Sequence, residues 1–284
     1  IRSYTIVYKR VIFSERFNIP RFMSAYQPVS KESHLTKRWV RPTNLDFAAG
    51  DVSCKIAAIE VYKCAAYVPM AFLQSGDSYS LAIIQGLKEG QNLYVGPNGV
   101  WLPPYAPAIY RFHPFRLAAI DDEDDRKILC VNEGSIVSEH SREAETFFTE
   151  EGVLNPTVSG IFDSLTATLD SFESTKIICE TLVRNKLIKP WNVKIDRNGV
   201  ESPLQGLHCI DESKFNKVNG KILRELRDIG ALPVIYCQLF SMQQIKRLAK
   251  IAQAHDNHEQ IAANTDEIFA LDSPDHGSIS FDRL

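Results

Sequence analysis

The feature that most constrains the fold is a run of apolar residues from Val158 to Leu187 that recur at steps of three and four. Such steps place side chains on one face of an α-helix. Pro156 suits the first turn of a helix, and Thr157 or Ser159 can cap its N-terminus. The sequence therefore predicts one long helix with a single apolar face that must pack against the rest of the protein.

Short strand candidates accompany this helix, and turn residues separate them into pairs. The pairs are "MAFLQ" with "YSLAIIQGL", the two halves of "QNLYVGPNGVWLPP", "FRLAAI" with "KILCVNE", and "WNVKI" with "LHCID". Regular alternation of strands and helices, which a doubly wound parallel sheet requires, is missing. The order of elements predicts an α+β fold with a mixed, largely antiparallel sheet, flanking helices and one long central helix.

Four further segments have helical or strand character. Residues Lys55–Tyr67 have the apolar spacing of a short helix, and "KFNKVNGKILRELRDIG" predicts a helix that ends at Gly230. "LPVIYCQLF" reads as a buried strand, because it is a short and nearly continuous apolar run. "SMQQIKRLAKIAQAH" predicts a basic amphipathic helix capped by Ser241.

The chain has no low-complexity linker, so we expect a single domain over residues 23–256. Residues 1–22 are locally cationic and precede the first methionine, Met23. Two explanations stay open for them: a non-native leader with initiation at Met23, or a genuine basic arm that attaches to a surface. The polar and acidic residues 257–284 are expected to form a flexible tail.

Composition excludes several classes of protein. A net charge of −3 gives no basic field to attract nucleic acid, and no apolar run reaches the roughly 20 residues that cross a bilayer. The six cysteines lie in apolar segments without a CxxC pair, which is typical of free buried thiols in a reducing compartment. A secretory signal pattern is also missing, so we expect a cytoplasmic protein.

Familiar catalytic and ligand motifs fail when they are tested residue by residue. Neither a P-loop, a GxGxxG fingerprint nor a GxSxG elbow is present. The acidic run "DDEDD" fails as an EF-hand, because Arg126 takes a ligand position and Lys127 replaces the required glycine. His255 and His258 have no third zinc ligand nearby in the sequence. We therefore predict no cofactor and no metal.

The highest density of aromatic and ionisable side chains lies in "YAPAIYRFHPF", from Tyr105 to Phe115. A histidine between Arg111 and Arg116 tends to stay neutral, which suits either a base or a packed aromatic-like side chain, and we favour packing for His113. Arg111 beside aromatic rings can serve a buried carboxylate or a ligand. His34, among charged residues, fits a structural hydrogen bond better than proton transfer.

From about Gln27 to Ala254 the chain resembles the bacterial SapC family. The resemblance rests on "PVSKESH", "WVRP", "FAAG", "GQNLYV", "YAPAIYRFHPF", "LCVNE", "LQGLHCIDESKF" and "GALPVIYCQLFSMQQIKRL", in this order. The family pattern often has tyrosine at the position of His113 and usually has histidine at that of Gln238. Neither position then supplies a required base.

The resemblance implies no reaction or cofactor that can be transferred to this chain. It implies a role in surface-layer biology or in TonB-linked nutrient uptake, because such genes lie near TonB-dependent receptors and flavin-dependent halogenase-like enzymes. The leading hypothesis is a non-enzymatic accessory protein that binds a protein partner. The alternative is an enzyme that modifies a small molecule or peptide of the same gene cluster. The candidate binding residues are His34, Arg41, Tyr110, Arg111, His113 and Glu133.

Overall fold

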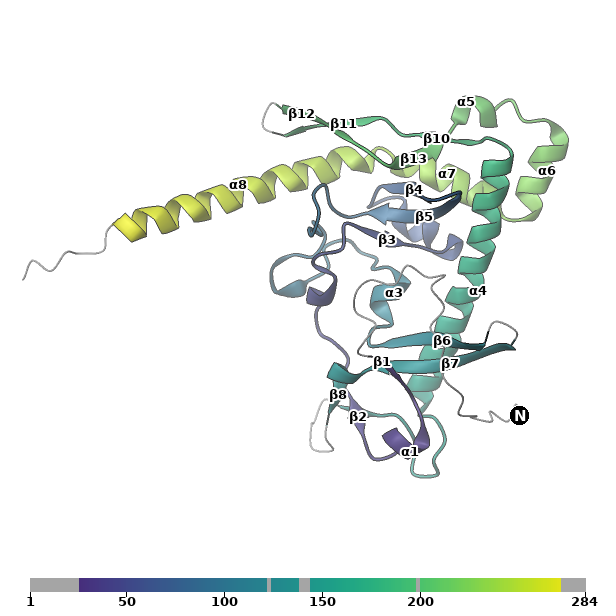
Figure 1. Ribbon diagram of the computed structural model, residues 1–284, viewed down its shortest axis with the longest axis vertical. Coiled ribbons are helices and arrows are strands. Elements are labelled where there is room, and N and C mark those ends of the chain that lie inside the picture. Colours follow the sequence, from purple (N-terminus) through teal and green to yellow (C-terminus); the bar gives the residue numbers. More distant parts are fainter. Residues whose placement is uncertain (1–25, 122–123, 138–143, 198–199, 272–284) are drawn as a thin grey trace, which may run out of the picture.

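The computed structural model describes residues 26–121, 124–137, 144–197 and 200–271. A five-stranded sheet forms its upper part, two three-stranded sheets form its lower part, and helix α4 (Pro156–Arg184) runs beside both (Figure 1). This arrangement confirms the predicted α+β class and the long helix. The expected leader at residues 1–22 lies outside the described residues, and the expected domain limits stay a prediction.

The upper sheet has the strand order β10-β13-β4-β5-β3, and each neighbouring pair is antiparallel. The predicted β4–β5 hairpin is confirmed; Ser75 pairs with Ser78 across a turn in which Gly76 has a φ of 56°. A left-handed φ of this kind favours glycine. The strands are β3 (Ser53–Lys55), β4 (Met70–Ser75), β5 (Ser78–Ile84), β10 (Ile188–Pro190) and β13 (Leu207–Ile210).

A separate antiparallel ribbon, β11 (Val193–Arg197) with β12 (Val200–Leu204), leaves the upper sheet and packs against helix α8. The predicted strands "WNVKI" and "LHCID" therefore both exist but do not pair with each other. The first pairs with β12, which the sequence did not predict, and the second pairs with β10 and β4.

The lower sheets have the orders β1-β7-β6 and β8-β2-β9. The predicted hairpin between "FRLAAI" and "KILCVNE" is confirmed as β6–β7. The predicted hairpin around "GPNG" is reduced to a single bridge between Val95 and Trp101. The strands are β1 (Tyr26–Pro28), β2 (Arg38–Trp39), β6 (Phe115–Asp121), β7 (Asp124–Asn132), β8 (Ile136–Val137) and β9 (Glu145–Thr146).

Helix α4 links two hydrophobic cores. Its N-terminal half contributes Val158 and Leu165 to the lower core, and its C-terminal half contributes Ile178 and Leu182 to the upper one. Asn155 caps the helix, since its side-chain oxygen accepts from the Thr157 amide at 3.0 Å; the expected Thr157 or Ser159 cap is wrong. One continuous apolar face therefore serves both parts of the molecule.

The remaining helices are short, apart from α8, which projects from the body in Figure 1. The predicted helix over Lys55–Tyr67 is helical only from Ala58 to Cys64, because Lys55 belongs to β3. The helices other than α4 are α1 (Lys31–His34), α2 (Val61–Cys64), α3 (Ala108–Arg111), α5 (Glu212–Phe215), α6 (Gly220–Asp228), α7 (Ala231–Ser241) and α8 (Gln244–Leu271). The 3₁₀ turns are η2 (Asp46–Ala48), η3 (Ala58–Glu60), η4 (Pro97–Gly99) and η5 (Glu133–Ser135).

The segment "LPVIYCQLF" is not a strand but most of helix α7, and this prediction was wrong. Its buried positions, which include Val234, Ile235, Gln238 and Ser241, recur at helical steps and face β4 and β13. Pro233 is tolerated because it lies in the first turn, where an amide has no intrahelical partner. A continuous apolar run has no period that separates a buried helix from a buried strand, so only packing decided between them.

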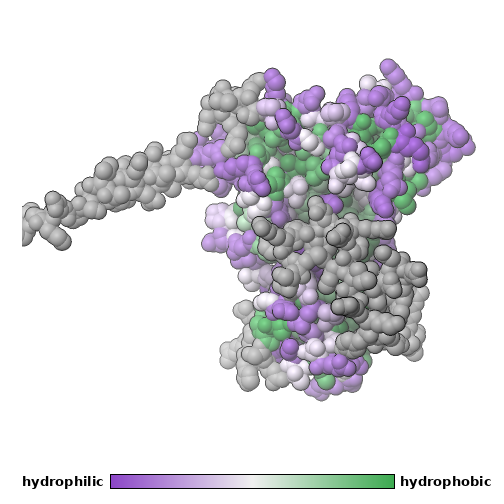
Figure 2. Space-filling view, in the orientation of Figure 1, coloured by the Kyte–Doolittle hydropathy of each residue, from purple (hydrophilic) through white to green (hydrophobic). Residues whose placement is uncertain are grey.

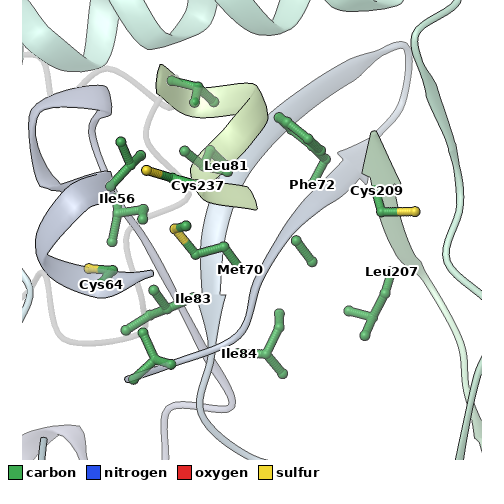
Figure 3. Close-up of a cluster of buried hydrophobic side chains, with 14 of the residues drawn as sticks. Ile56, Cys64, Met70, Phe72, Leu81, Ile83, Ile84, Leu207, Cys209 and Cys237 are labelled. Atoms are coloured by element: carbon green, nitrogen blue, oxygen red, sulfur yellow. The ribbon is translucent and has the colours of Figure 1, made fainter. Parts of the chain in front are cut away.

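The upper core lies between the sheet and helices α2, α4 and α7. Figure 3 shows Cys64 from α2 and Cys237 from α7 on the same side of the sheet as Met70 and Leu81. Complete burial of one large side chain of this kind stabilises the fold by about 1.5–3 kcal/mol. Ser241 does not cap α8 as expected; its hydroxyl accepts from the Met70 amide at 3.0 Å and ties α7 to β4.

Candidate functional site at the junction of the two cores

The run "YAPAIYRFHPF" crosses from one core to the other. Helix α3 begins after Pro107, whose restricted φ suits that position. Tyr110 is buried in the upper core, and Phe115, five residues later, is buried in the lower core. Figure 1 accordingly shows α3 between the upper sheet and strands β6 and β7. This short segment and α4 join the two halves of the protein.

Tyr110 forms the centre of a polar network inside the upper core. Its hydroxyl donates to Asp51 Oδ2 at 2.8 Å and accepts from Gln85 Nε2 at 3.0 Å. Burial raises the pKa of Asp51, and the hydrogen bond from Tyr110 opposes part of that rise. Burial also raises the pKa of Tyr110, so its proton stays on the hydroxyl. Asp51 and Gln85 thus satisfy a buried phenol that would otherwise be unpaired.

His113 follows α3 and packs as an aromatic ring. It stacks on Phe47 with 4.1 Å between ring centroids, and its Nδ1 lies 3.2 Å from the Tyr26 hydroxyl. Burial, together with the positive charge of Arg116, lowers the pKa of His113 to about 4. The Arg116 guanidinium itself lies over the Tyr26 ring, 4.7 Å from its centroid. His113 is therefore neutral at pH 7, which agrees with the packing role favoured for it.

A second buried carboxylate, Glu60, organises the start of α3. Only 1% of Glu60 is exposed, and its carboxylate accepts from the Ala57 amide at 3.0 Å, the Ala108 amide at 2.7 Å and the Tyr105 hydroxyl at 2.9 Å. Arg111 Nη2 donates to the Tyr105 hydroxyl at 2.9 Å. Because the Tyr105 hydroxyl donates its hydrogen bond to Glu60, Arg111 supports the buried carboxylate through the phenol.

The Arg111 guanidinium is held in place by its surroundings. It lies over the rings of Tyr105 and Phe112, with centroid distances of 4.9 and 5.2 Å, and its Nε donates to the Ala106 carbonyl at 3.0 Å. Lys63 lies over the same Tyr105 ring at 5.1 Å. Cations over aromatic faces gain about 0.5–1 kcal/mol at exposed sites. This geometry links Arg111 to the buried Glu60 through the Tyr105 hydroxyl.

His34 lies in the lower core, away from α3. It is fully buried, its ring meets Phe147 edge-on at 4.9 Å, and its Nδ1 contacts the Ser30 carbonyl at 3.3 Å. Burial lowers the pKa of His34, so the neutral ring is favoured. Its Nε2 has no hydrogen-bond partner among the described residues. These contacts make His34 a packing residue at the end of α1.

Arg41 and Glu133 lie at the surface of the lower part. The Arg41 guanidinium lies 3.9 Å from Glu145 and 5.6 Å from the centroid of the Trp39 ring. Glu133 begins η5 and is exposed. Among the described residues, no hydrogen bond, ion pair or ring contact joins the side chains of any two of the six candidate residues. The six residues lie on several elements, and their joint role as a binding site stays a prediction.

Sequence reasoning missed Asp51, Gln85 and Glu60, which are the groups that pair with α3. Glu60 did carry a signal, because it is the only charge in the apolar run "AAIEVY". A charged residue in such a run is either solvent-exposed or buried with partners, and only the fold shows which. Asp51 and Gln85 carry no comparable signal, since they lie outside the helices and strands and are more than thirty residues apart in the chain.

Few described residues at the junction could bind a metal or act as a nucleophile. No group of three His, Cys, Asp or Glu side chains suited to a metal occurs in the part of the chain that the structure describes. All six cysteines are buried and free, and burial raises the pKa of each thiol, for example to about 12 for Cys64. A thiol of this kind is a poor nucleophile. No described helix is long and apolar enough to cross a membrane.

These features define an α+β protein with two cores, in which the buried side chains of Tyr110 and Glu60 are paired within the chain. A profile of the SapC family matches residues 29–248, and the chain belongs to this family. No curated protein and no solved structure matches the chain. The family match covers the lower core, the junction segment, helix α7 and the upper core as far as Leu248.

Proposed function

We propose that this protein is an accessory protein of a bacterial surface-layer or TonB-linked uptake system, and that it acts by binding a protein partner. One observation carries the binding role: large apolar side chains are exposed on η3, α2 and α7, and these elements contact each other. These side chains are Ile59, Tyr62, Tyr236 and Phe240, exposed by 63%, 67%, 47% and 66%, and we refer to them as the docking face. Large exposed apolar patches mark interaction sites on soluble proteins.

The elements that carry the docking face pack against each other. Helix α2 contacts α7, and η3 leads directly into α2. On α7, Tyr236 and Phe240 are four residues apart and stack with 6.5 Å between ring centroids. Phe215 of α5 supports Tyr236 from the side, edge-on at 5.7 Å. Aromatic rings held in this way contribute large contact area at low entropic cost.

The base of the docking face is fixed by hydrogen bonds into the sheet. The Gln238 side chain accepts from the Ile210 amide at 3.0 Å and donates to the Met70 carbonyl at 3.1 Å. Ser241 adds its bond from the Met70 amide. Since α7 is bonded to both β4 and β13, its exposed rings are presented on a rigid support, which favours binding.

The system in which the protein acts is proposed from the resemblance of its sequence to SapC proteins. The proposal includes a cytoplasmic location, which the six free, buried cysteines support because a reducing compartment keeps thiols unpaired. An enzyme acting through the six candidate residues is less favoured, because no hydrogen bond, ion pair or ring contact among the described residues joins their side chains.

Affinity purification from the native host tests the binding role. We expect the tagged wild-type protein to recover a partner in near-equal amount, and the double variant Tyr236→Ser/Phe240→Ser to lose it. A matched control, Leu35→Ser/Val153→Ser, removes two exposed apolar side chains elsewhere, which are exposed by 47% and 63%. Repeated recovery of the wild-type protein alone would overturn the proposal.

A further inference from the structure

A group of unpaired cations borders the docking face. Lys217, Lys221 and Arg224 are exposed, and no ion pair involves them among the described residues. They lie on α6 and on the loop after α5. Both elements adjoin the docking face, because α6 packs on α7 and Phe215 contacts Tyr236. In Figure 2 the end of the molecule around α5 and α6 is mainly hydrophilic, with apolar residues between. We refer to these three cations as the basic rim.

The carboxylates of the same elements do not neutralise the basic rim, because most are already engaged. Helices α5 and α6 and the residue before α5 carry four carboxylates: Asp211, Glu212, Glu225 and Asp228. Among the described residues, only Glu212 of these has no ion-pair partner. The engaged pairs are Asp211 with Lys189 and Lys214, Glu225 with Arg184, and Asp228 with Arg227. The surface beside the stacked rings therefore carries a local positive charge although the whole chain is at −3.

We propose that the docking face and the basic rim together bind an acidic amphipathic segment of a partner protein. The apolar side chains of that segment lie on Tyr236 and Phe240, and its carboxylates meet the basic rim. This inference rests on the proposed function and names the partner's chemistry. Complementary charge around an apolar centre speeds encounter and sets specificity.

A second copy of the chain fits this surface poorly. A twofold interface is isologous, so each surface patch meets its own image. The basic rims of both copies would then lie in one interface, and like charges brought together across an interface cost several kcal/mol. The unpaired cations thus select a partner of opposite charge over self-association.

An anionic membrane is also disfavoured. Each Lys or Arg near such a surface contributes about 1 kcal/mol, so three rim cations give about 3 kcal/mol, well short of stable attachment. The negative charge of the whole chain opposes the approach further. Carboxylates on a peptide, in contrast, can each approach one cation within hydrogen-bond distance.

Site-specific photocrosslinking in the native host tests the inference. The probe is p-benzoylphenylalanine placed at position 240 of the full chain, and the control places it at position 153, which is equally exposed in the lower part. We expect position 240 to capture a peptide of another protein in which carboxylates outnumber Lys and Arg and apolar residues recur at helical steps. Capture of this same chain, of lipid, of a neutral or basic peptide, or of nothing above the control overturns the inference.

Charge-reversal variants distinguish a failure of this inference from a failure of the proposed function. We expect Lys221→Glu/Arg224→Glu to lower crosslinking at position 240 by about 10-fold or more, since it places like charges at the interface. Lys246→Glu/Lys250→Glu, on the exposed part of α8, should leave crosslinking unchanged. If both double variants retain the wild-type partner, the acidic-segment inference fails while the binding function stands. If the unsubstituted chain has no partner, both fail.

Discussion

Tyr110 and Asp51 are joined by a hydrogen bond of 2.8 Å between the phenol of α3 and a carboxylate fifty-nine residues earlier in the chain. The bond fixes the junction segment to the upper core, where Tyr110 is 4% exposed. Gln85, at the end of β5, completes the arrangement. A phenol, a carboxyl and an amide are thus used for fold stability at the place where the sequence suggested a ligand site.

Removal of the Tyr110 hydroxyl tests this role. We expect Tyr110→Phe to lower the free energy of unfolding by about 1–3 kcal/mol, because Asp51 and Gln85 lose their partner inside the protein. Urea unfolding measures the change. Tyr62→Phe is the control, since Tyr62 is 67% exposed and its loss should fall within about 0.5 kcal/mol. Equal losses in the two variants would contradict the role.

Substitution of Glu60 should lower the free energy of unfolding more than removal of the Tyr110 hydroxyl does. In Glu60→Gln, the amide nitrogen meets donors where the carboxylate accepted from the Ala57 and Ala108 amides and from Tyr105. We expect a loss of about 2–4 kcal/mol in unfolding free energy, because charge-assisted hydrogen bonds are replaced by an unpaired buried donor. Glu150→Gln, at an exposed position, provides the comparison and should be near neutral. Wild-type stability of Glu60→Gln would show that the three donors contribute nothing.

Gln238 should be required for the attachment of α7. We expect Gln238→Leu to cost about 2–4 kcal/mol, because it leaves the Ile210 amide and the Met70 carbonyl without their partner in a fully buried place. Chemical denaturation of this variant and of Gln243→Leu, which changes an exposed glutamine, measures the difference. A variant as stable as wild type would mean that packing alone holds α7 to the sheet.

The stability should depend on pH through His113. Its pKa falls from an ordinary value of about 6.5 to about 4 in the folded protein, so the unfolded chain binds more protons between these values. The free energy of unfolding therefore falls as pH drops from about 6.5 to about 4, by about 1–2 kcal/mol once partial exposure is allowed for.

His113→Phe isolates this contribution, because it keeps an aromatic ring on Phe47 and removes the titration. His34, whose pKa is also lowered, has the same sign, while the raised pKa of Asp51 has the opposite sign; both remain in the variant. We expect a shallower loss of stability on acidification than in the wild type, measured by urea unfolding across that pH window. Parallel pH curves would rule out His113 as the cause.

Much of the secondary structure could be predicted from local patterns in the sequence. The long helix and the hairpins β4–β5 and β6–β7 follow from periodicity and from turn residues, because both are properties of neighbouring residues. Helix α7 was mistaken for a strand, because an apolar run without a period contains no local information on its conformation. Its assignment came from its packing against β4 and β13.

Only part of the candidate site could be predicted from the sequence. The run from Tyr105 to Phe115 stands out in the sequence, and a packing role for His113 follows from its cationic neighbours. The partners of the run, Asp51, Gln85 and Glu60, come from distant segments, so no spacing rule could find them.

By itself, the sequence determined the α+β class, the resemblance to SapC proteins and the aromatic setting of Arg111, since these depend on composition, order and short-range spacing. Only the tertiary structure decided that Arg111 supports Glu60 through Tyr105. It also decided that Tyr236 and Phe240 remain outside the core, beside cations that have no ion pair within the described part of the chain. The physical reason is that burial and pairing are properties of contacts between distant segments. A side chain's place in the core, or on a binding surface, is set by the element that packs against it.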